Sequence, residues 1–169
     1  FPAWDDERWR GWASPEDPAP SVRFGSVEIE AGGLPGGLPA EPGLRELVPE
    51  RLSLPAAVDR ERGSLVIEAG SAGRERALAL MRLAMVRLLA SSPAGRVKFT
   101  LLDPVGLGQS FAGFMRLADH DPSLVGARIW TEPRHIEQRL ADLTEHMETV
   151  IQKYLRDEYA TIEAYNEVA

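Results

Sequence analysis

Apolar and polar residues alternate in the first regular segment of the chain. Residues 21–30, SVRFGSVEIE, carry apolar side chains on either side of Gly25, and this pattern predicts a strand that a bend interrupts. The glycine- and proline-rich residues 31–43 have neither a helical nor a strand period, so they predict a loop. Residues 44–63 predict a second connector that contains a helical turn.

Two continuous apolar runs predict strands that are buried on both faces. They are SLVIEAG at 64–70 and RVKFTLLDP at 96–104. Between them, leucines and methionines recur at steps of three and four over residues 78–89, which predicts a helix packed against a sheet. Pro93 and Gly95 end that helix. Strands and helices that alternate with short connections are typical of an α/β sheet with right-handed crossovers.

The last third of the chain predicts mostly helix. Residues 110–119 predict a short helix, 123–130 a short strand and 159–168 a short tail helix. The clearest helix begins at an N-cap, Thr131, with Pro133 in its first turn. Its apolar side chains follow alternating steps of four and three, as in a coiled coil or in a helix that lies on a sheet, and we favour the sheet. This apolar seam consists of Ile136, Leu140, Leu143, Met147, Val150 and Tyr154.

Composition restricts the class of protein. The chain has 169 residues, enough for one domain with a core. It has no cysteine, which excludes disulfides and thiolate metal sites. No apolar run approaches the roughly 18 residues that cross a bilayer, and the polar start is no signal peptide, so we expect a cytoplasmic location without membrane contact. A net charge of -7 means that the surface as a whole does not attract DNA.

Residues 1–20 combine three tryptophans with acidic residues and prolines, which predicts a tail or linker. We interpret the tryptophans as packing against the main domain or a missing neighbour, and a partner-docking patch is the alternative. The Phe at position 1 and the abrupt end suggest a piece of a longer chain.

The residues after the first apolar run match part of a phosphate-binding loop, G-x-x-x-x-G-K-[ST]. In that loop, glycines let backbone amides surround the phosphates, the lysine reaches the outer phosphates and the hydroxyl holds magnesium. In GSAGRERA, Gly70 matches the first glycine, but Glu75, Arg76 and Ala77 occupy the other three defining positions. Glu75 places a negative charge beside the phosphates. Arg76 keeps a positive charge with a different geometry, and Ala77 cannot bind magnesium.

This loop and the end of the next strand form a candidate nucleotide site. Ligands of α/β sheets lie beyond the carboxyl ends of the strands, so the loop and Asp103 are expected at one mouth. We interpret the loop as unable to support hydrolysis or to hold Mg²⁺. Two alternatives stay open: weak ATP binding through the amides and Arg74 or Arg76, and a plain turn in which Glu75 stabilises the helix dipole. The candidate residues are Gly70, Ser71, Ala72, Gly73, Arg74, Glu75, Arg76, Ala77 and Asp103.

The order of these motifs resembles the motor domain of the FtsK/SpoIIIE family of DNA translocases. That family runs from GTTGSGKS through a helix to a strand V-R-F-x-x-I-D-P-K, then to a helix with E-M-E-x-R-Y and a later Y-N. The resemblance spans residues 50–169, and Val105 stands at the D-P-K lysine. The matching residues are Gly70, Gly73, Val97, Phe99, Asp103, Pro104, Met147, Glu148, Tyr165 and Asn166.

The resemblance implies an α/β fold, an incomplete P-loop NTPase (RecA-like) module of three layers with a mostly parallel sheet. Residues 64–169 would form the N-terminal part of the motor domain, after a tail or linker at 1–20 and a strand plus connector at 21–63. The parent would be an ATPase that moves along double-stranded DNA as a homo-oligomeric ring, together with other domains of a longer chain. The family's catalytic acidic pair follows the last residue here, so no catalytic residue is assigned and the fragment alone is expected to be inactive.

Two other functions stay open. One is a non-catalytic assembly or docking module of a multi-domain motor, as in the related type VII secretion ATPases, which move proteins. The tryptophans and the apolar seam would then be docking surfaces, and the acidic balance favours this reading because a DNA-tracking surface should be basic. The other is an unrelated α/β domain that binds a different anionic ligand at the Gly70 turn.

Overall fold

The structure is a computed structural model that describes residues 5–60, 63–126, 128–156, 158–166 and 168. It consists of two compact units, Phe1–Val97 and Lys98–Ala169.

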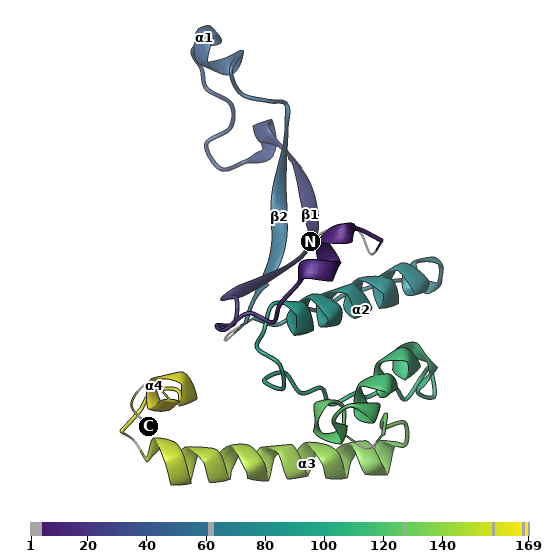
Figure 1. Ribbon diagram of the computed structural model, residues 1–169. Coiled ribbons are helices and arrows are strands. Elements are labelled where there is room, and N and C mark those ends of the chain that lie inside the picture. The colour runs from purple at the N-terminus through teal and green to yellow at the C-terminus, as the bar shows by residue number, and fades with distance from the viewer. Residues whose placement is uncertain (1–4, 61–62, 127, 157, 167, 169) are drawn as a thin grey trace. The chain divides into compact units, whose positions relative to one another are not determined.

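A long β-hairpin forms much of the first unit. β1 (Ser21–Glu30) and β2 (Arg51–Asp59) pair antiparallel, from Ser21 opposite Asp59 to Glu30 opposite Arg51. The register shifts between Arg23 and Gly25, which is a β-bulge and confirms the predicted interrupted strand. The connection between the strands carries the short helix α1 (Pro42–Arg45) at the far end of the hairpin (Figure 1).

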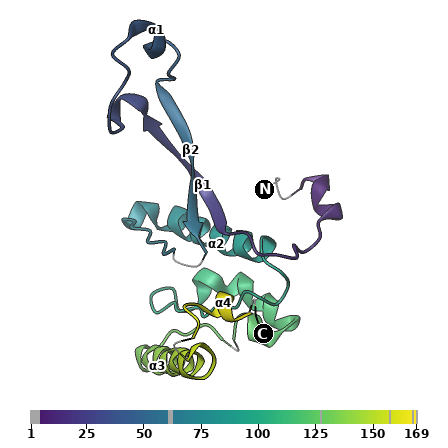
Figure 2. The same cartoon turned by 90° about the vertical axis from the view of Figure 1, so that its left-hand side faces the viewer.

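Helix α2 (Arg74–Ala90) lies across the other end of the hairpin and packs against β1, as both cartoon views show (Figures 1 and 2). It confirms the helix predicted after the Gly70 turn. Val22 on β1 and Ala84 on α2 are buried in this unit. The segment before β1 is tied to the end of α2, because the amide of Ala19 donates to the Ser91 carbonyl and the amide of Ala94 donates to the Ser14 hydroxyl.

The second unit is mostly helical. A 3₁₀ helix (Gln109–Asp119) supplies buried Phe111 and Phe114, and Phe114 meets Phe99 edge to face at 6.1 Å. The long helix α3 (Pro133–Val150) confirms the predicted helix, although its N-cap is Glu132 and not Thr131. A π-helical turn (Ile151–Leu155) follows, and α4 (Ile162–Asn166) confirms the tail helix. Tyr165 of α4 stacks edge to face on Tyr154 and on Tyr159.

The predicted parallel, RecA-like sheet is wrong. Among the described residues the sheet has two strands, β1 and β2, and they are antiparallel. Residues 64–70 form no strand, and Val66 is 81% exposed, because no neighbouring strand pairs with them or covers them. Residues 96–104 have one isolated parallel bridge, from Leu102 to Trp130, and no ladder. β2 lies within residues 44–63, which were predicted to be a connector, so that prediction is wrong for Arg51–Asp59. β2 contains Pro55, although proline lacks the N–H that a strand ladder uses.

No helix in the described part of the chain is both long enough and apolar enough to cross a membrane.

Candidate functional site

The predicted phosphate loop forms a short turn at the start of α2. Gly70 precedes a single 3₁₀ turn (Ser71–Gly73), and the Gly73 amide donates to the Gly70 carbonyl at 2.9 Å. α2 begins directly afterwards at Arg74. The Gly73 amide therefore already donates to the backbone of the turn.

The two glycines of this turn do not need to be glycine. Gly70 has φ -69° and Gly73 has φ -95°, so neither adopts the left-handed conformation that favours glycine. A Cβ on Gly70 would meet nothing within 4 Å, and one on Gly73 would make an ordinary contact of 3.4 Å with Ala69. A concave nest of amides for phosphate alternates right- and left-handed residues. Gly70 and Gly73 supply no left-handed position for such a nest.

The charged side chains of the turn extend into solvent. Arg74, Glu75 and Arg76 are exposed, and Ala77 is half-buried. Glu75 lies in the first turn of α2, where a carboxylate stabilises the positive end of the helix dipole by about 0.3–1 kcal/mol. This local geometry matches the plain-turn alternative, and Ala77 offers no ligand for a metal.

Asp103 is buried in the second unit, and both of its carboxylate oxygens accept hydrogen bonds from backbone amides. One carboxylate oxygen, Oδ1, accepts from the Gly106 amide at 2.8 Å. The other, Oδ2, accepts from the amides of Gly108 at 3.1 Å and Ser110 at 3.0 Å. These bonds hold the loop that leads into the 3₁₀ helix, in which Gly108 has φ 86° and Leu107 φ 51°. Since a left-handed leucine costs roughly 1–2 kcal/mol, the carboxylate stabilises a strained loop.

The hydrogen bonds also set the ionisation of this carboxyl. Burial raises the pKa of Asp103, but the amides of Gly106, Ser110 and Gly108 and the Ser110 hydroxyl together outweigh burial and lower the pKa below its ordinary value of 3.8. Asp103 is therefore an ionised residue that fixes a loop. Its lone pairs are directed at backbone donors.

The candidate residues fall into two groups. Gly70–Ala77 lie together in the first unit, and Asp103 lies in the second. That the Gly70 turn and Asp103 contribute to one ligand site stays a prediction. The role of Gly106, Gly108 and Ser110 as donors to Asp103 was missed. Its signal was an aspartate followed at short spacing by small residues, the pattern of side-chain-capped turns.

Among the residues that the structure describes, no three His, Asp or Glu side chains are close enough to hold a metal ion. No family model, curated protein or solved structure matches the chain.

We expect Asp103→Asn to lower the free energy of unfolding at pH 7 by about 2–3 kcal/mol, because its NH₂ group would face backbone donors. The folded-state pKa lies below the unfolded value, so the carboxylate stabilises the fold above pH 3.8 and this contribution is lost as pH falls through the folded pKa. The free energies of unfolding of the unaltered chain and of Asp103→Asn, measured with urea, should therefore differ less at pH 3 than at pH 7. Asp119→Asn, at an exposed carboxylate of the same unit, should change stability by under about 0.5 kcal/mol; equal effects at both sites would contradict this role.

A matched glycine pair tests the same loop sterically. A Cβ at Gly106 would lie 2.5 and 2.7 Å from the Asp103 carboxylate oxygens and would also clash with the Ser110 hydroxyl, whereas one at Gly113 would meet nothing within 4 Å. We expect Gly106→Ala to cost about 1–3 kcal/mol through overpacking. Gly113→Ala should be neutral or stabilising by up to about 1 kcal/mol, since it lies in a helix. Thermal unfolding of both variants is the measurement, and an unaffected Gly106→Ala would show that the loop is loose.

Proposed function

We propose that this chain is a non-catalytic assembly module of a multi-domain motor of the FtsK/SpoIIIE type. It docks on other domains of that motor in the cytoplasm, and a separate ATPase copy supplies the turnover. The motifs of the chain resemble that family, whereas its sheet is antiparallel and not the parallel sheet of a RecA-like motor.

The exposed apolar seam of α3 carries the proposal. No residue of α3 is buried, and Leu140 is 48% and Met147 62% exposed. The seam continues into the π-helical turn with Tyr154, which is 37% exposed, and Ile151 beside the seam is 51% exposed. The other three members of the seam, Ile136, Leu143 and Val150, are half-buried. Large apolar side chains that contact water along one helix are unfavourable unless a partner covers them. Its coiled-coil spacing suits a partner helix.

The geometry of the candidate nucleotide residues supports a module without hydrolysis. The Gly70 turn has no lysine and no hydroxyl at the defining positions, and its glycines are not left-handed. Asp103 directs both carboxylate oxygens at backbone amides. A phosphoryl-transfer site needs a lysine and a metal to neutralise the developing charge. These residues offer neither.

The net charge of -7 also favours contact with protein over contact with DNA. Any contact of the motor with double-stranded DNA is therefore assigned to its other domains.

Nucleotide binding tests the catalytic half of the proposal. We expect the chain to bind ATP with a Kd no tighter than about 1 mM, with or without Mg²⁺. In the triple variant Glu75→Gly, Arg76→Lys and Ala77→Ser we expect magnesium-dependent affinity at least about tenfold higher, because the three defining groups return. Titration calorimetry is the measurement.

Glu75→Gln is the control, since it removes the charge and restores none of the three groups, and it should show no gain. Micromolar, magnesium-dependent binding by the unaltered chain would refute a non-catalytic module. A triple variant without any gain would refute descent of the turn from a phosphate loop.

If the seam is a docking surface, charged side chains placed on it should hardly change the stability of the fold. We expect the double variant Leu140→Lys and Met147→Lys to change the free energy of unfolding by under about 0.5 kcal/mol, because neither side chain is part of a core. The same variant should abolish any self-association of the chain seen by sedimentation equilibrium. Phe111→Lys, at a side chain that is 7% exposed, is the contrasting control and should unfold the second unit. A loss of several kcal/mol in the double variant would mean that the seam is core and not a docking surface.

A further inference from the structure

The far half of the β-hairpin is a two-stranded ribbon with an uncovered apolar face. Side chains alternate between the two faces of β1 and β2, so residues that lie opposite each other share a face. On one face Val27 lies opposite Leu54, and both side chains are exposed. The next pair on that face, Ile29 and Leu52, is half-buried. Two strands alone are marginal in water, and a third strand or a packed helix stabilises such a ribbon.

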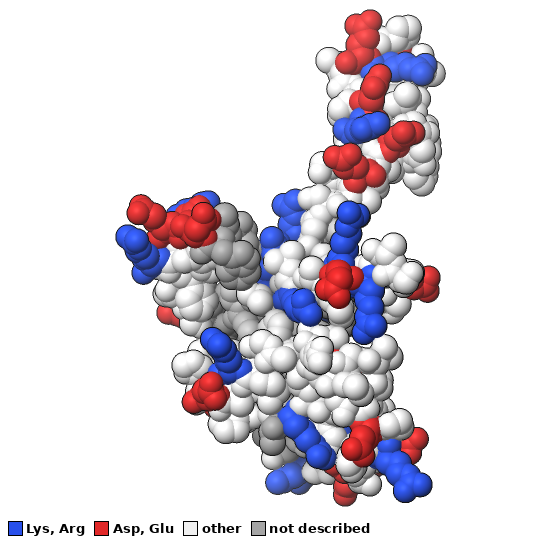
Figure 3. All heavy atoms as spheres, turned by 90° about the vertical axis from the view of Figure 1, so that its right-hand side faces the viewer, with Lys and Arg blue, Asp and Glu red and all other residues white. Residues whose placement is uncertain are grey.

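The polar face of this ribbon and the connection at its end are acidic. Residues 26–55 contain five glutamates and two arginines, and all seven are exposed. Figure 3 shows acidic side chains gathered over the upper part of the hairpin. Glu28 and Glu30 lie on β1 itself, on the face opposite to Val27. A basic partner therefore suits this end of the first unit.

The hydrogen bonds at the two ends of the ladder show which backbone groups face outward. The Arg60 amide donates to the Pro20 carbonyl, and the Ala31 amide donates to the Glu50 carbonyl, both at 3.0 Å. Bonded and unbonded pairs alternate along an antiparallel ladder. The even-numbered residues of β2 therefore face β1, and its odd-numbered residues direct their backbone groups away from β1.

Proline blocks the outer edge of β2. Pro55 has an odd number, so the N–H that it lacks would have faced outward, and the ladder with β1 loses no bond. The outer edge of β2 has no donor at this position. A strand that tried to pair along this edge would meet the proline ring, which is a common protection of edge strands.

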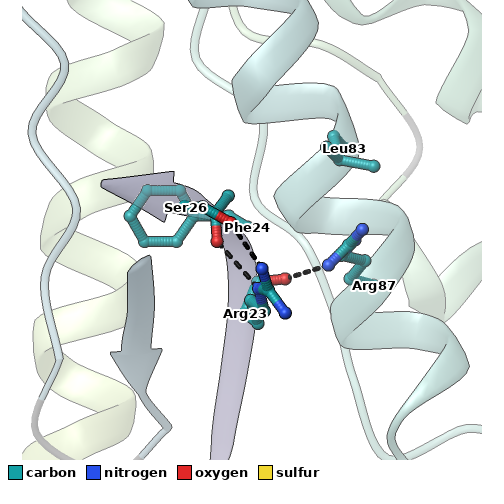
Figure 4. A pocket seen from close by; sticks show the side chains of 6 residues that line it. Arg23, Phe24, Ser26, Leu83 and Arg87 are labelled. Atoms are coloured by element: carbon teal, nitrogen blue, oxygen red, sulfur yellow. Dashed lines mark hydrogen bonds between the residues drawn. The ribbon is translucent and has the colours of Figure 1, made fainter. Parts of the chain in front are cut away.

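The outer edge of β1 is open along its far half. Ser26, Glu28 and Glu30 lie opposite odd-numbered residues of β2, so they too face outward. Their N–H groups, and the C=O groups of Ser26 and Glu28, have no backbone partner among the described residues. Nearer to α2, Arg87 donates from Nη1 to the Arg23 carbonyl at 2.6 Å, so α2 occupies the edge there (Figure 4).

We propose that the β1 edge from Ser26 to Glu30 binds an extended segment of another protein as a third strand. Basic and apolar side chains alternate in this segment. The basic ones meet Glu28 and Glu30, and the apolar ones extend the face of Val27 and Ile29. Backbone hydrogen bonds supply affinity in this mode of recognition, and the alternate side chains supply specificity.

A second copy of β1 fits this edge less well than a basic strand. It would add the same two glutamates, Glu28 and Glu30, to the polar face, and like charges on neighbouring strands are unfavourable. The β1 edge is also separate from the apolar seam of α3, because it uses no residue of the second unit. The two docking surfaces are therefore independent of each other.

The test uses the whole chain and labelled seven-residue peptides in which valine alternates with lysine, with serine or with glutamate. By fluorescence anisotropy at pH 7 and low salt, we expect the lysine peptide to bind with a Kd of about 100 μM or tighter, and at least about tenfold more tightly than the glutamate peptide. The serine peptide keeps the backbone and the apolar face without charge, so its affinity should lie between the other two.

Variants at one cross-strand pair locate the edge. Glu28→Pro removes an outward N–H from β1 and should weaken the lysine peptide at least about tenfold, because the ring also blocks the added strand. Ser53→Pro is the matched control, since Ser53 lies opposite Glu28 and faces the outer edge of β2, and it should change the Kd less than about twofold. Glu28→Gln keeps the N–H, so it should weaken the lysine peptide and leave the serine peptide unchanged. Circular dichroism checks that each variant is folded.

Amide exchange in the unaltered chain decides the matter if a proline loosens the hairpin. The amides of Glu28 and Glu30 should exchange at least about tenfold more slowly with the lysine peptide bound, and the Ser53 amide should not change. The proposal is overturned if the lysine peptide does not bind, if the glutamate peptide binds as tightly, or if Ser53→Pro weakens binding as much as Glu28→Pro. Protection of Glu28 that rises with chain concentration in the absence of peptide would assign the edge to a second copy and would also overturn the proposal.

Discussion

The second unit depends on one buried carboxylate. The Asp103 carboxylate accepts hydrogen bonds from three backbone amides. These amides belong to the loop in which Leu107 has a left-handed conformation. Buried donors without an acceptor cost about 1–3 kcal/mol each, so the loop is stable only while the carboxylate stays in place and ionised. The same bonds decide what Asp103 cannot do. A cation that took over its oxygens would leave the amides unsatisfied, and the loop would have to open.

The local elements could be predicted from the sequence, and their assembly could not. β1, α2 and α3 follow from periodicity, because the spacing of apolar residues reports which face of a segment meets a core. Periodicity does not identify the neighbour of a segment. Residues 64–70 have the composition of a buried parallel strand, yet they lie in an exposed, unpaired conformation. β2 shows the opposite failure. It lies in a segment that predicted a connector, yet Arg51–Asp59 pair with β1 over their whole length, with Pro55 inside the strand.

The candidate site divides in the same way. Asp103 was selected because it ends an apolar run that predicted a strand. No strand ladder forms there, and both carboxylate oxygens accept hydrogen bonds from the small residues that follow Asp103. The Gly70 turn was selected by its glycines. Their backbone angles are open to any residue, so the motif alone overstated how far the backbone is specialised there. A sequence pattern shows which residues are present, whereas a cradle for phosphate is a property of dihedral angles.

The two ends of α2 differ in the charge that the helix dipole favours. At the first end, the amides and the dipole favour negative charge, and Glu75 supplies a carboxylate in the first turn. At the other end the dipole is reversed and favours a cation, and Arg87 lies in the last turn. Glu75 therefore stabilises the start of α2 whether or not the Gly70 turn ever formed a phosphate loop.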